Sequence, residues 1–117
     1  MNDVNDKILR LYTRLNSLKQ NLPANSSVKE KYVREYHSIV QELESTTKLP
    51  LAEFKIADGE VKPLLASYNG MTGEKNYTKE RFCDKSFLLA KLDALLGYFQ
   101  IKYLSEEKRT IGFKQND

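Results

Sequence analysis

The stretch KSFLLAKLDALLGYFQIKY, residues 85–103, decides the fold that the sequence predicts. Between residues 88 and 99 it carries only two charged side chains, Lys91 and Asp93. On a helix its bulky residues form one stripe, and smaller residues form a second stripe at heptad spacing. The bulky stripe is Leu88, Leu92, Leu95 and Phe99, and the second is Cys83, Phe87, Ala90, Ala94, Gly97 and Ile101. Both apolar sides of such a helix are expected to pack against another segment of the chain or against a partner.

The first part of the chain supplies cover for one side. Apolar residues recur at steps of three and four from Val4 to Leu22, which predicts a helix with a single apolar stripe. Pro23 ends this helix, and a second apolar face runs from Tyr32 to Leu43. Two helices joined by a short loop predict an antiparallel helical hairpin over residues 1–46.

The middle of the chain, residues 47–77, has no clear helical period and contains Pro50 and Pro63. We expect an irregular connecting segment, in which either a short strand or a short helix would fit. Its apolar residues should pack against the helices, and these are Phe54, Ile56, Leu64 and Leu65. Residues 69–76, NGMTGEKN, are typical of a loop.

The predicted fold is a single all-α domain over residues 1–117, a helical bundle. In it the hairpin packs on a long apolar helix over residues 78–105, followed by a polar tail over residues 106–117. A composition of 40% hydrophobic and 30% charged residues is typical of folded proteins and not of disordered chains.

The second stripe of the long helix remains to be covered. Either the middle segment folds over it or a second copy of the protein does, because leaving it in water would expose a larger apolar patch than monomers usually carry. We therefore expect a partner interface on this helix, formed with another copy or with another protein. Its expected residues are Phe87, Ala90, Ala94, Gly97, Tyr98, Phe99 and Ile101.

Residues suited to catalysis are sparse. His37 is the only histidine and Cys83 the only cysteine, so the sequence has no zinc-type spacing of ligands and cannot form an intramolecular disulfide. We expect a boundary position for His37 and a buried, inert thiol for Cys83. No phosphate-binding glycine motif occurs. The sequence thus predicts no catalytic, metal or cofactor site, and a protein that is not an enzyme.

The expected location is the cytoplasm. The opening residues, MNDVNDKILR, do not have the pattern of a signal peptide. The most apolar stretch is interrupted by Lys91 and Asp93 and is too short to span a bilayer, so we expect no membrane association.

An alternative function comes from KNYTKERFCDK, residues 75–85, in which basic and aromatic residues alternate. Such interleaving is typical of phosphate contacts combined with base stacking, although Glu80 and Asp84 lie among the same residues. The candidate nucleic-acid contacts are Lys75, Tyr77, Lys79, Arg81 and Lys85.

The net charge of +3 is mildly basic. In size, charge and helical content the chain resembles the small all-α subunits of multi-subunit RNA-guided complexes. The alternative is therefore a nucleic-acid-binding accessory subunit of a ribonucleoprotein-type complex. The main prediction is a non-catalytic protein–protein interaction or assembly module that associates with itself through the apolar helix face.

Overall fold

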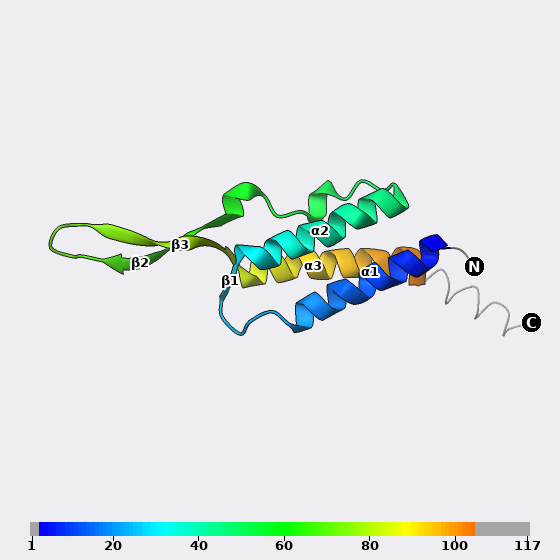
Figure 1. Ribbon diagram of the computed structural model, residues 1–117, viewed down its shortest axis with the longest axis horizontal. Helices are drawn as coiled ribbons and strands as arrows, with labels where there is room; N and C mark the ends of the chain where they lie inside the picture. The colour runs from blue at the N-terminus through cyan, green and yellow to red at the C-terminus, as the bar shows by residue number, and fades with distance from the viewer. Residues whose placement is uncertain (1–2, 105–117) are drawn as a thin grey trace, which may run out of the picture.

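The computed structural model of the protein describes residues 3–104 and combines helices with a three-stranded antiparallel sheet (Figure 1). The helices are α1 (Asp3–Gln20), α2 (Glu30–Thr47) and α3 (Lys85–Phe99), and a π-helical turn, η3 (Gln100–Leu104), extends α3. The strands are β1 (Ser27–Lys29), β2 (Val61–Tyr68) and β3 (Lys75–Asp84), in the order β1-β3-β2. The prediction of an all-α bundle is therefore wrong. The tail predicted at residues 106–117 lies outside the described residues.

The three helices pack side by side and contain most of the core (Figure 1). α1 and α2 run antiparallel, so the predicted helical hairpin is present, although β1 lies between its two helices. One predicted stripe on each helix faces inward, because burying it removes apolar surface from water, whereas most of the second stripe predicted for α3 is exposed or half-buried. Their buried members are Ile8, Leu11, Leu15 and Leu18 on α1; Val33, Tyr36, Ile39, Val40 and Leu43 on α2; and Leu88, Leu92, Leu95, Leu96 and Phe99 on α3.

The first part of the middle segment covers the helices as expected. Two 3-10 turns, η1 (Ala52–Phe54) and η2 (Asp58–Glu60), lead from α2 toward β2. Leu51, Phe54 and Ile56 are buried against the helical body. The hydroxyl of Tyr36 donates a 2.7 Å hydrogen bond to the carbonyl of Phe54, which fixes η1 on α2.

The second part of the middle segment departs from the prediction. β2 and β3 pair as a long hairpin, and Leu64 and Leu65 lie exposed on β2 instead of packing on the helices. Pro63 is compatible with a strand here because β2 is at the edge of the sheet. On its outer side, within residues 3–104, there is no neighbouring strand of the sheet to which the backbone N–H that proline lacks would have to donate.

The long helix was predicted to begin at residue 78 but begins at Lys85. Asp84 is its N-cap and accepts hydrogen bonds from the Ser86 backbone N–H and hydroxyl. Residues 78–84 have enough helical propensity to suggest the start of a helix, but pairing of β3 with β2 holds them extended. Propensity is a weak prior that tertiary pairing overrides.

The hairpin gives the molecule an elongated shape of 76 × 26 × 21 Å. We call β2, β3 and the loop between them the arm. Its base joins the core through Val61 and Cys83, which are paired across the strands and buried. Its outer part projects beyond the end of the helical body, while the start of α1 and the end of α3 lie at the opposite end (Figure 1).

Candidate interaction surfaces

The residues predicted to form an interface on α3 lie in different environments. Phe99 is buried in the core, and the ring of the half-buried Tyr98 lies 5.7 Å from that of Phe54. Phe87 is also half-buried. Ala90, Ala94 and Ile101 are exposed and Gly97 is partly exposed. We call Ala90, Ala94, Gly97 and Ile101 the outer face of α3, since they share the side turned away from the core.

The bulky stripe of α3 is therefore covered within one chain, by α1, α2 and the segment around η1. The outer face of α3 is uncovered within the described part of the chain. It consists of small side chains apart from Ile101, whose side chain is 72% exposed.

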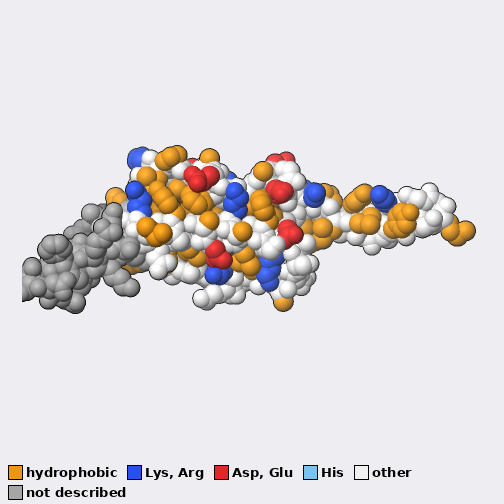
Figure 2. All heavy atoms as spheres, turned by 180° about the vertical axis from the view of Figure 1, so that it is seen from behind, with side chains coloured by type: hydrophobic (Ala, Val, Ile, Leu, Met, Phe, Trp, Pro, Cys, Tyr) orange, Lys and Arg blue, Asp and Glu red, His pale blue; other side chains and the backbone are white. Residues whose placement is uncertain are grey.

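The arm has two different faces. Residues directly opposite one another in an antiparallel pair point to the same side, and alternate residues along a strand share a side. Tyr77 and Lys75 alternate on β3, and their partners on β2 are Leu65 and Tyr68, which a register shift between Leu65 and Ser67 brings to the same side. We call the side shared by these four residues the docking face. Tyr77 and Tyr68 are 57% and 58% exposed, and Leu65 is 52% exposed. Figure 2 shows apolar side chains along the projecting arm as well as on the helical body.

The opposite face of the arm is polar. Ser67 pairs with Asn76, and the Asn76 amide donates a 3.1 Å hydrogen bond to the Ser67 hydroxyl. A bulge around Thr78 shifts the register closer to the base, where the Thr78 hydroxyl accepts a hydrogen bond from the Leu64 N–H. Near its tip the arm thus has one face with apolar and aromatic side chains beside Lys75 and one polar face, while nearer the base Leu64 is exposed on the side opposite to Leu65.

The loop at the tip is held by its own hydrogen bonds. The Asn69 side chain accepts from the Met71 N–H, and the Gly73 N–H donates to the Asn69 carbonyl. Gly73 has a φ of 78°, which favours glycine. Met71 at the tip is 96% exposed, which extends the apolar surface of the arm to its end.

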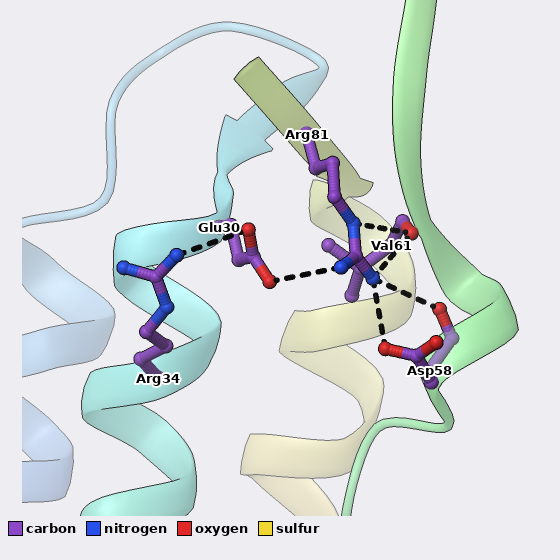
Figure 3. A network of polar contacts seen from close by, with 5 residues as sticks. All are labelled: Glu30, Arg34, Asp58, Val61 and Arg81. Atoms are coloured by element: carbon purple, nitrogen blue, oxygen red, sulfur yellow. Dashed lines mark hydrogen bonds and ion pairs between the residues drawn. The ribbon is translucent and has the colours of Figure 1, made fainter. Parts of the chain in front are cut away.

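Two of the five candidate nucleic-acid contacts hold the fold together. The Arg81 guanidinium donates to the Val61 carbonyl at 2.9 and 3.1 Å and pairs with the Asp58 and Glu30 carboxylates at 2.8 and 3.5 Å (Figure 3). Hydrogen bonding to Asp58 raises the Arg81 pKa further. The Lys85 ammonium donates to the Pro23 carbonyl at 2.7 Å, which ties the α1–β1 loop to the start of α3.

The other three candidates lie on β3. Lys75 and Tyr77 are exposed in the outer arm, and Lys79 is exposed nearer its base. Lys79 lines a cleft of about 470 Å³ together with residues from β1 and the first turns of α2. The structure therefore separates the predicted group and adds to Lys79 a set of cations that are distant in sequence, Lys29, Lys31 and Arg34.

The two residues considered for chemistry have structural partners. His37 Nε2 accepts a 2.9 Å hydrogen bond from the Ile56 N–H, and both burial and the Lys55 ammonium lower the His37 pKa. Cys83 lies on β3 and not on the helix where the sequence placed it, and it is buried. Burial, followed by the nearby Asp84 and Glu60 carboxylates, raises the pKa of its thiol, so the reactive thiolate is disfavoured.

Within residues 3–104, no group of three or more His, Cys, Asp or Glu residues is arranged to hold a metal ion. No helix in this range has both the length and the apolar character needed to cross a membrane. Comparisons with protein-family models, with curated proteins and with solved structures gave no significant match.

Sequence reasoning missed the docking face. The signal that could have revealed it is Asn69-Gly70, because an Asn-Gly pair between two segments rich in Leu, Tyr and Thr is typical of a β-hairpin. When the pair is interpreted only as a loop, no projecting hairpin is predicted. The exposure of Leu65, Tyr68 and Met71 therefore could not be anticipated.

Proposed function

We propose that the protein is a non-catalytic assembly module that associates with a second copy of itself. In this assembly the docking face of each arm packs on the outer face of α3 of the other copy. One contact would cover the docking face and the outer face of α3 together. A cytoplasmic location remains part of the proposal and is supported by Cys83, a single cysteine that can form no intramolecular disulfide.

The observation that carries this proposal is the exposed docking face on an arm that has no other layer beneath it. A two-stranded hairpin alone is only marginally stable in water. Leu65, Tyr68 and Tyr77 are each more than half exposed. A partner surface over these residues would stabilise the arm and bury their apolar area, and tyrosines are favoured at the centres of protein interfaces.

The outer face of α3 fits this role in length and shape. On the docking face, residues 65–68 of β2 extend about 10 Å. On the outer face of α3, the helix from Ala90 to Gly97 also extends about 10 Å. The large side chains of the docking face would lie against Ala90, Ala94 and Gly97, whose small size permits close approach of the two backbones.

A reciprocal arrangement supports a closed dimer. Each copy has one arm and one α3, so a two-fold axis would form the same contact twice and double the buried area.

The test is the solution mass measured by light scattering at low and high salt. We expect a dimer that persists at high salt, because apolar association does not weaken as salt rises. The double variant Leu65→Asp with Tyr77→Asp should be monomeric, since it places two charges on the docking face. The matched control is Ser67→Asp with Asn76→Asp, which adds the same charge to the polar face and should remain dimeric.

A separate variant tests the outer face of α3, the second surface of the proposed contact. Ala94→Arg on the outer face of α3 should also give a monomer, whereas Gln41→Arg at an exposed position of α2 should not. A monomeric wild-type protein would refute the proposal, as would a control double variant that dissociates as readily as the docking-face variant.

A further inference from the structure

Two clefts meet at Lys31 on the first turn of α2. One is the cleft of about 470 Å³ beside the base of the arm, lined by β1, α2 and β3. The other has a volume of about 450 Å³ and lies between the end of α1 and the start of α2. Lys31 lines both clefts, so they adjoin at this side chain, and we refer to the two together as the groove.

The cleft beside the arm is basic. Its lining contains five cationic side chains and the two carboxylates Glu30 and Glu80, which leaves an excess of three positive charges. Glu30 is paired with both Arg34 and Arg81, and Glu80 is paired with Lys29. Within residues 3–104, neither Lys31 nor Lys79 has a carboxylate within ion-pair distance. These two ammonium groups are therefore open to an anionic ligand.

The cleft between α1 and α2 has a different lining. The half-buried Tyr32 lies there with Asn21, Ser17 and Arg14, and with the Glu35 carboxylate, which pairs with Arg14 at 3.3 Å. The Lys31 ammonium lies 5.2 Å from the centre of the Tyr32 ring. An aromatic ring beside an amide and a hydroxyl provides a stacking surface next to hydrogen-bonding groups. Such a combination suits a nucleobase, while the excess of cations in the adjoining cleft beside the arm suits phosphates.

We propose that this groove binds a single-stranded nucleic acid, with phosphates at Lys31 and Lys79 and a base at Tyr32. The charge excess matches a polyanion, and the aromatic cleft beside it gives a base a place that an acidic peptide would not need. The groove contains no residue of the docking face or of the outer face of α3. Nucleic-acid binding is therefore independent of the proposed dimer and is tested separately from it.

The probe is a fluorescently labelled 20-nucleotide oligouridine, and the readout is fluorescence anisotropy over a series of salt concentrations. We expect binding at low salt that weakens steeply as salt rises, because phosphate contacts release counterions. Lys31→Glu and Lys79→Glu should each weaken binding on the order of tenfold and lower the salt slope by about one. The matched control is Lys7→Glu at an exposed position of α1 outside the groove, which should bind like the wild type.

Two variants of Tyr32 distinguish the contribution of base stacking to binding from the contribution of charge. Tyr32→Phe keeps the ring and should leave binding unchanged, whereas Tyr32→Leu should weaken it without changing the salt slope. Thermal unfolding of both variants checks that the fold is intact. The monomeric Leu65→Asp with Tyr77→Asp variant should bind the oligonucleotide like the wild type.

Several outcomes would overturn this assignment. They are the absence of binding at low salt, a loss in Lys7→Glu equal to that in Lys31→Glu, and binding that does not change with salt. Loss of binding in the monomeric arm variant would also place the site elsewhere. Binding of a polyglutamate peptide in preference to the oligonucleotide would assign the groove to an acidic protein segment instead.

Discussion

At the scale of single residues, His37 shows how a residue that resembles a catalytic base can serve the fold. Its Nε2 accepts a hydrogen bond from the Ile56 N–H, which only the neutral imidazole can do. The bond connects α2 to the segment after η1, where Ile56 is buried. The Lys55 ammonium nearby further disfavours the protonated ring. A single histidine in a helix therefore stabilises the packing of the middle segment.

This role predicts a pH dependence of stability. The His37 pKa is lowered in the folded state, so the unfolded chain binds a proton more readily. The stabilisation should be present above about pH 6.5, the unfolded value, and be lost as the pH falls through the folded pKa. We expect the melting temperature to fall between pH 7.5 and pH 5.5, and to fall less in His37→Gln.

The carboxylates of Asp84 and Glu44 do not complicate this measurement. Hydrogen bonds from Ser86 and from the Leu51 N–H lower their respective pKa values, so both groups titrate below this pH range. An equal pH dependence in the wild type and in His37→Gln would contradict the role assigned to the histidine.

Arg81 provides a second prediction, because its contacts differ in expected strength. Asp58 is 94% exposed at the side chain, and exposed ion pairs contribute little. Asp58→Asn should therefore change the free energy of unfolding by less than about 0.5 kcal/mol. Arg81→Met removes the hydrogen bonds to the Val61 carbonyl and should cost about 1–2 kcal/mol. Chemical denaturation of both variants measures the difference, and equal effects would show that the pair with Asp58 dominates.

At the scale of elements, the boundary between β3 and α3 depends on Asp84. Its carboxylate accepts from the Ser86 backbone N–H at 2.9 Å, which satisfies a donor that the first turn of the helix leaves free. The same residue ends the pairing between β1 and β3 opposite Ser27. The chain therefore changes from strand to helix at Asp84, the residue that caps the helix.

The predicted cost of removing this cap is about 1 kcal/mol for Asp84→Ala. Asp84→Asn should retain most of the stability, because an amide oxygen also accepts the hydrogen bond and asparagine is a good N-cap. Thermal or chemical unfolding distinguishes the two variants. If Asp84→Asn lost as much stability as Asp84→Ala, the contribution would come from charge and not from the cap.

At the scale of the molecule, the arm and the helical body have separate sources of stability. The buried core lies in the body and ends at the base of the arm, at Val61 and Cys83. Beyond this base, the large apolar residues of the arm, such as Leu65 and Met71, are exposed. The body should therefore fold without the outer arm, while the outer arm depends on the body and, in our proposal, on a second copy.

Replacing residues 64–80 by Asn-Gly tests this independence, because Pro63 and Arg81 are paired and a two-residue turn can join them. We expect the helical circular dichroism signal and the cooperative melting transition to be retained. The shortened protein should also be monomeric by light scattering. Loss of cooperative unfolding would show that the outer arm contributes to the core.

By itself, the sequence determined the three helices of the body. The residue spacing predicted one buried stripe on each helix, with members from Leu11 on α1 to Leu88 on α3, whereas most of the second stripe predicted on α3 is exposed or half-buried. This succeeds because the contacts that define a helix lie three and four residues apart, so the pattern is local. The sequence also placed Phe54 and Ile56 against the helices, where they are buried.

Only the tertiary structure decided the arm and the groove. Residues 75–84 become a strand because they pair with residues 61–68 across a loop, whereas local propensity alone favoured a helix from residue 78. Lys31 and Lys79 line one cleft only because β1 and the start of α2 pack beside β3. Both features depend on contacts between segments distant in sequence, and the spacing of residues within one segment carries no information about such contacts.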